Sequence, residues 1–138
     1  MDVVVRKARK EDAGQMLEVY DNFTRRFVGG VQRSVKNVTR IIREKDTVNY
    51  VALDRENRVV AYVHAHFEKP MRRGEFREIV VDPEHDFVLI AKPLIEEVNA
   101  YFMEKKAAAI VAGSVRNPNL QKLFPKMGFF ESESLGVF

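Results

Sequence analysis

The stretch from Ile79 to Ile95, IVVDPEHDFVLIAKPLI, constrains the fold more than any other part of the chain. Its pattern is that of a strand that runs through a turn directly into a helix. The first N–H groups of such a helix have no backbone partner and lie at the positive end of the helix dipole, so an anion can bind there. The stretch therefore predicts a strand-to-helix junction with phosphate-binding geometry, although the glycines that let a phosphate approach closely are absent.

The length and composition predict one folded domain over residues 1–138. A chain of 138 residues is long enough to bury roughly two-thirds of its unfolded surface in a single core. It has no cysteine, which excludes a disulfide framework, a thiolate metal cluster and a cysteine nucleophile. The opening MDVVVRKARKED contains no long apolar run. We therefore expect no signal peptide, no membrane association and a cytoplasmic location.

The net charge of +3 raises the question of nucleic-acid binding. The basic residues are dispersed along the chain, and acidic residues are interleaved with them throughout. This pattern favours a solvated surface with a modest positive field over a nucleic-acid interface, since no recognition motif accompanies the charge. We expect no nucleic-acid partner, whereas an anionic cofactor would be attracted by the same field.

Strand and helix patterns alternate along the chain. Strand patterns cover residues 3–5, 50–53, 59–67, 76–82 and 108–112, and helix patterns start near Glu11 and Ser34, follow the strand at 76–82 and cover 120–127. The polar turn DREN joins two of the strands and predicts a hairpin. Helices before and after a central antiparallel run predict an α/β sandwich with a mixed sheet.

Four segments in this order resemble the GNAT superfamily of N-acetyltransferases. VRKARKEDAGQMLEVY resembles its first strand and helix, VVAYVHAHF its third strand, VVDPEH the end of its fourth strand, and NPNLQKLFPKMGF its late helix with the Gly-Phe that starts another strand. The resemblance spans almost the whole chain. It implies a GNAT-like mixed, mostly antiparallel central sheet flanked by helices, with a short C-terminal end.

The resemblance also implies acetyl-CoA as a co-substrate. GNAT proteins hold its pantetheine arm like an added strand in a fork beside the fourth strand, which places Ile79 and Val81 at the cofactor. They bind the pyrophosphate on backbone amides of a loop that matches residues 86–91, where Ala91 fits the family pattern. Asn117 matches a position that often contacts the cofactor, and a helix N-cap is its alternative role.

Four residues depart from the family pattern. Asp86 places a negative charge where a basic or amide residue is usual, and Leu89 replaces a glycine. Pro93 predicts a helix that starts late or kinks near Lys92. Phe124 stands where family members have a tyrosine that protonates the departing thiolate, so solvent or another residue would have to act.

Glu78 is the predicted catalytic residue, because the family often has a general base at this position on the fourth strand. A carboxylate can remove the proton from an acceptor ammonium whose pKa is near ~10. Strand alternation predicts that Glu78 shares a face with Phe76 and Val80, in partly apolar surroundings. The alternative is an exposed glutamate paired with an arginine such as Arg77 or Arg58.

A metal site is not expected. His64 and His66 share one face of a predicted strand about 7 Å apart, a spacing that can chelate a metal. No third ligand of sure position accompanies them, and strand residues of this kind commonly just pack. We therefore predict no metal ligand in this chain.

Two functions from different classes remain open. The first is an enzyme that transfers an acetyl group from acetyl-CoA to an unidentified amine acceptor by direct attack. The second is a non-catalytic GNAT-fold module that binds a ligand or a protein, which the departures at Asp86, Leu89 and Phe124 favour. The short C-terminal end leaves an open sheet edge, from which we expect a possible homodimer.

Overall fold

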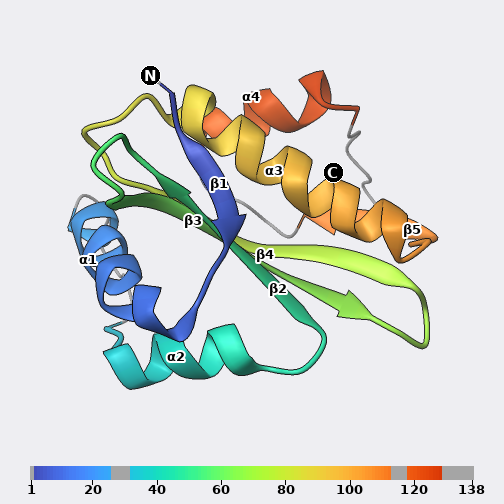
Figure 1. Cartoon of the computed structure of the whole chain (residues 1–138). Coiled ribbons are helices and arrows are strands. Elements are labelled where there is room, and N and C mark those ends of the chain that lie inside the picture. The colour runs from blue at the N-terminus through green and yellow to red at the C-terminus, as the bar shows by residue number, and fades with distance from the viewer. Residues whose placement is uncertain (1, 26–31, 113–117, 129–138) are drawn as a thin grey trace.

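A five-stranded sheet forms the centre of the protein in the computed structural model, which describes residues 2–25, 32–112 and 118–128. The strands lie in the order β1 (Val4–Lys7), β2 (Thr47–Leu53), β3 (Val59–Glu68), β4 (Arg73–Val81) and β5 (Ala109–Ala112). The first four pair antiparallel, and β5 pairs parallel with β4. The predicted mixed, mostly antiparallel sheet is thus confirmed (Figure 1).

Helices cover both faces of the sheet (Figure 1). They are the short 3-10 helix η1 (Lys10–Asp12) and the α-helices α1 (Ala13–Thr24), α2 (Val35–Arg43), α3 (Phe87–Glu104) and α4 (Pro118–Lys126). One apolar cluster joins α1 and α2 to one face, where it includes Tyr62 and Val80. A larger cluster joins α3 and α4 to the opposite face, where it includes Val63, Phe76 and Ile79. Within the described ranges, no helix is long and apolar enough to cross a membrane.

The start of α2 follows directly from its sequence. The Ser34 hydroxyl accepts a hydrogen bond from the backbone N–H of Asn37 at 3.2 Å. The Asn37 side-chain oxygen accepts one from the backbone N–H of Ser34 at 3.0 Å. This reciprocal capping satisfies two groups that would otherwise lack partners, and it confirms the predicted helix start near Ser34. The cap also fixes the chain just after Arg33, a residue that becomes important below.

The beginning of α3 differs from the prediction. The helix starts at Phe87, six residues before Pro93, so the late start is wrong, whereas the alternative, a kink near Lys92, stays a prediction. A proline inside a helix costs roughly 3 kcal/mol, because one backbone hydrogen bond is lost. Ile90, Leu94 and Ile95 of this helix are almost completely buried. Burying each such side chain contributes about 1.5–3 kcal/mol, which offsets the cost of the proline.

Candidate active site

In the part of the chain that the structure describes, strand β4 is paired on both sides along only part of its length. Residues 73–76 pair with residues 109–112 of β5. Residues 78–81 pair with β3, and they have no partner on β5 within the described residues, which on that strand end at Ala112. A strand edge without a partner can be extended by an added strand, and this outer edge of residues 78–81 is the open edge. Ile79 and Val81 are 8% and 2% exposed as whole residues, and their side chains are packed in the core.

A β-bulge lies just after the last described residue pair between β4 and β5. His64 pairs with Glu78 and Ala65 pairs with Phe76, so Arg77 is an extra residue in β4. Phe76 packs in the cluster beneath α3, whereas Glu78 contacts Tyr62 on the face covered by α1. The predicted common face of Glu78 and Phe76 is therefore wrong, because the bulge interrupts strand alternation.

Glu78 lies in a cluster of polar and aromatic side chains. Its two carboxylate oxygens each accept a hydrogen bond from the Arg33 guanidinium at 2.6 Å. The Tyr62 hydroxyl donates to the same carboxylate at 2.5 Å. The Arg33 guanidinium also lies 4.0 Å from the centre of the Tyr20 ring. Glu78 is thus paired with an arginine, but its partner is Arg33 and not Arg77 or Arg58.

The pKa shifts of its neighbours define the charge state around Glu78. Burial and the charge of Glu78 raise the pKa of Tyr62, so this phenol stays protonated. Burial lowers the pKa of Arg33, but hydrogen bonding to Glu78 and the Glu78 charge outweigh that effect and raise it. Both groups therefore remain hydrogen-bond donors to Glu78 through the neutral pH range.

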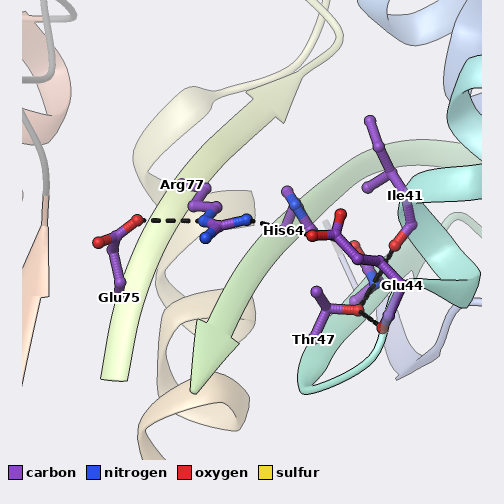
Figure 2. Close-up of polar contacts among 7 residues, drawn as sticks. Ile41, Glu44, Thr47, His64, Glu75 and Arg77 are labelled. Carbon is purple, nitrogen blue, oxygen red and sulfur yellow. Dashed lines mark hydrogen bonds and ion pairs between the residues drawn. The ribbon is translucent and has the colours of Figure 1, made fainter. Parts of the chain in front are cut away.

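A second group of polar residues lies beside the bulge. Figure 2 shows Arg77 between Glu75 and Glu44. Its Nε lies 3.1 Å from Oε1 of Glu75, and its Nη1 lies 3.8 Å from Oε1 of Glu44. The neighbouring His64 is 7% exposed, and its Nδ1 lies 2.7 Å from the side-chain oxygen of Asn49. Burial lowers the pKa of His64 to about 4, so the ring is neutral at pH 7.

The histidines of β3 are not part of a visible metal site. His64 is bonded to Asn49 in the protein interior, and His66 is half-buried on the same strand. Across the residues that the structure describes, no three His, Cys, Asp or Glu side chains are grouped so as to hold a metal ion. Hydrogen bonding within the sheet, such as that between His64 and Asn49, explains the polar side chains on this face of β3 better than metal binding does.

The N-terminus of α3 is capped by the side-chain carboxylate of its N-cap residue, Asp86. The side chain of Asp86 accepts a hydrogen bond from the N–H of Leu89 at 3.1 Å, and its carbonyl accepts one from the N–H of Ile90 at 3.3 Å. In the described part of the chain, the N–H groups of Phe87 and Val88 have no such partner. A negative charge thus already occupies part of the anion-binding position.

The remaining predicted positions have different outcomes. Ala91 is fully buried in the apolar cluster beneath the sheet, so its side chain does not face the open edge. Phe124 is also fully buried, with its ring 5.9 Å from that of Phe76, and is therefore a core residue. Asn117 and the predicted final strand after Gly128 lie outside the described residues.

Sequence reasoning did not find Arg33 and Tyr20. Arg33 is one of many dispersed basic residues, and 45 positions separate it from Glu78. Tyr20 appears in the sequence only as part of an apolar helix pattern. Neither pattern indicates a long-range contact, so no sequence signal identifies this pair.

A separate cleft of about 580 Å³ lies between α1 and the turn after β4. Its lining includes Glu18, Arg58, Asp82 and Glu84. The side-chain amide of Asn22 donates to Asp82 across it at 3.5 Å. The three carboxylates outnumber the two guanidinium groups of the lining, those of Arg25 and Arg58, which makes this cleft less favourable for a diphosphate.

The fold is that of known acetyltransferases. The sequence matches no protein-family model and no curated protein. Among solved structures, a GNAT-family acetyltransferase from Staphylococcus aureus Mu50 aligns with a TM-score of 0.82 at 14% identity, covering 96% of this chain and 87% of that one. Ribosomal-protein-alanine N-acetyltransferase from Brucella melitensis aligns with a TM-score of 0.76 at 16% identity, covering 96% and 94%.

A spermidine N-acetyltransferase from Vibrio cholerae also aligns, with a TM-score of 0.72 at 19% identity. The alignment covers 94% of this chain and 80% of that one. Likeness over nearly the whole of these chains confirms the predicted architecture. The protein has the GNAT fold.

Proposed function

We propose that this protein is an N-acetyltransferase that moves an acetyl group from acetyl-CoA to an amine. The observation that carries this proposal is that the described pairing of β4 with β5 ends at Phe76, with a carboxylate, Glu78, two residues further along β4. An open strand edge can bind the amide-containing pantetheine arm through backbone hydrogen bonds. Several structural neighbours are acetyltransferases, and two are named for amine acceptors, alanine and spermidine.

In this proposal the backbone of Ile79 and Val81 binds the pantetheine arm. The free N–H groups of Phe87 and Val88 bind the pyrophosphate, with Asn117 as a further contact. Ala91 contributes to the cofactor site with its backbone and its small size, since its side chain is buried and cannot contact the cofactor. The Asp86 carboxylate next to these amides weakens cofactor binding, because it repels the diphosphate.

Glu78 acts as the general base. It accepts the proton of the acceptor ammonium, and the neutral amine then attacks the thioester carbonyl without a covalent enzyme intermediate. The C–S bond then breaks, the thiolate leaves, and the new amide nitrogen loses its extra proton to solvent. Phe124 has no proton to give, so solvent protonates the thiolate.

The alternative function is a non-catalytic module that uses the same fold to bind a ligand or a protein. The Asp86 cap and the ion pair between Arg33 and Glu78 favour it. Both features occupy groups that catalysis needs to be free. We place the enzyme first, because residues 78–81 of β4 have no partner strand on this side among the described residues, despite these substitutions.

Calorimetric titration with acetyl-CoA, combined with thermal unfolding, separates the two functions. The enzyme is expected to bind the cofactor and to unfold at a higher temperature in its presence, since a ligand that binds only the folded state stabilises it. Adenosine 3′,5′-bisphosphate, which lacks the pantetheine arm, is the matched control and should bind more weakly. No heat and no thermal shift at millimolar acetyl-CoA would leave the binding module as the better explanation.

A further inference from the structure

We propose that Tyr20, Tyr62 and Glu78 form a binding site for an organic cation, and that the chain's own Arg33 occupies this site. The natural occupant is then the positively charged head of the acceptor, a primary ammonium. This inference rests on the proposed function, because it assigns the acceptor site of that reaction. It also makes a statement about ligand binding that can be tested without acetyl-CoA.

The three side chains provide what a cation needs. The Glu78 carboxylate supplies the opposite charge, and both of its oxygens lie 2.6 Å from Arg33 nitrogens. The Tyr20 ring lies 4.0 Å from the guanidinium, within the range of a cation–π contact. The Tyr62 hydroxyl orients the carboxylate from the other side. The residues come from α1, β3 and β4, so the fold itself assembles the site.

Burial indicates that the walls are fixed and that the cation is exchangeable. Tyr20 and Tyr62 are 6% and 3% exposed, so they are held by packing. The side chains of Arg33 and Glu78 are 23% and 21% exposed, and the pair thus reaches solvent. A cation from solution can therefore approach the carboxylate along the same route that Arg33 uses.

A second arginine–carboxylate pair in this fold is more buried and is also held by the backbone. Arg6 binds both oxygens of Asp12 at 2.7 and 2.9 Å, and Asp12 also accepts the backbone N–H of Arg9 at 2.7 Å. The Asp12 side chain is only 9% exposed. In the described part of the chain, Glu78 receives hydrogen bonds from side chains alone. No backbone group ties that carboxylate to a single arrangement.

The geometry has a consequence for the reaction. While Arg33 is bound, its two N–H groups and the Tyr62 hydroxyl occupy the Glu78 oxygens, so an acceptor ammonium has no place to transfer its proton. An acceptor cation that replaces Arg33 would bring its proton to the same oxygens. Arg33 and the acceptor therefore compete for one site. A neutral molecule of the same shape gains no binding energy from the Glu78 charge or from the Tyr20 ring.

The test compares binding of n-butylammonium to the wild type and to Arg33→Gln, followed at the Tyr62 and Glu78 amides by NMR. Removing the resident cation should strengthen binding by at least about tenfold, which corresponds to the loss of one competing contact. Arg77→Gln removes a neighbouring arginine of the same face and should leave the affinity unchanged. 1-Butanol, the neutral control ligand, should not bind to either protein.

The double variant Arg33→Gln, Glu78→Gln should lose the gained affinity, because the carboxylate is gone. If Arg33→Gln does not fold, as judged by circular dichroism, Arg33→Lys replaces it, and its single ammonium should be displaced more easily than the bidentate guanidinium. Equal affinity of the folded variant and the wild type for n-butylammonium would overturn the proposal. Acetyl-CoA is absent from these experiments, so their failure is distinguishable from a failure to bind the cofactor.

Discussion

The two halves of β4 have the same secondary structure and opposite surroundings. The first half, residues 73–76, lies between β3 and β5 and packs against the aromatic core, where Gly74 and Phe76 face Phe102. The second half, residues 77–81, begins with the bulge and, among the described residues, pairs with β3 alone. The same strand thus stabilises the fold at one end, and we propose that its edge binds a ligand at the other.

The bulge at Arg77 separates these two roles. It turns Glu78 to the face covered by α1, next to Tyr62, while Phe76 stays in the opposite core. Without the extra residue, regular alternation would place Glu78 on the same side as Phe76. The comparison therefore predicts that changes in the second half alter chemistry and that changes in the first half alter stability.

The largest effect is expected from Glu78→Gln in the second half. Loss of a general base lowers turnover by about 10²–10⁴-fold, because the ammonium keeps its proton. The measurement is acetyl transfer to primary amines at saturating acetyl-CoA. Glu75→Gln, in the first half, is the matched control and should keep most of its activity. Turnover by Glu78→Gln that is undiminished from about pH 6 to 9 would remove this residue from the mechanism.

Gly74→Ala should destabilise the first half of the strand. An added Cβ would lie 2.5 Å from the Phe102 ring, which is fully buried and has no room to move away. Such overpacking lowers the free energy of unfolding by about 3 kcal/mol. Urea unfolding measures this change in the free energy of unfolding. Gly14→Ala, in α1 with nothing within 4 Å, should instead gain about 0.5–1 kcal/mol, and equal stability of the two variants would contradict the comparison.

His64, the partner of Glu78 across the bulge, should make stability depend on pH. Burial lowers its pKa from 6.5 to about 4, so as the pH falls the unfolded state takes up the proton first. The free energy of unfolding therefore decreases between about pH 6.5 and 4, by about 2 kcal/mol from pH 7 to 5. His64→Gln keeps a donor for Asn49 without a titrating group and should show a smaller loss. Identical pH profiles in urea unfolding would argue against a buried neutral histidine.

The smallest effect is expected from Asp86→Ser. Serine keeps an acceptor for the N–H of Leu89 but removes the negative charge from the start of α3. The helix dipole and the free amides then attract the diphosphate more strongly, by about 0.3–1 kcal/mol. Calorimetry should show acetyl-CoA binding a few-fold tighter than to the wild type. Weaker binding would mean that Asp86 aids the cofactor instead of repelling it.

The sequence predicted the elements more fully than the site. Periodicity located the described strands, although β2 and β4 each begin three residues earlier than predicted. Ser34 indicated the start of α2, because capping is a local interaction. The resemblance placed Glu78 correctly on β4. The bulge at Arg77 escaped prediction because strand alternation assumes regular pairing, which depends on β3.

The contacts of the site depend on the tertiary structure. The pairing of Arg33 with Glu78 joins segments that the sequence gives no reason to connect. For Asp86 the sequence predicts a charge unfavourable for phosphate, and this stays a prediction. Its role as a cap is visible only in the hydrogen bond to the N–H of Leu89. Local chemistry is therefore predictable here, and its long-range partners are not.

Hydrogen exchange in the presence and absence of acetyl-CoA tests most directly whether the open half of β4 binds the cofactor. The account predicts slower exchange in residues 77–82 when acetyl-CoA is added, because the backbone edge gains hydrogen-bond partners. Residues 73–76 already pair with β5 and should not change. Unchanged exchange in residues 77–82 at a saturating concentration of acetyl-CoA would contradict the account.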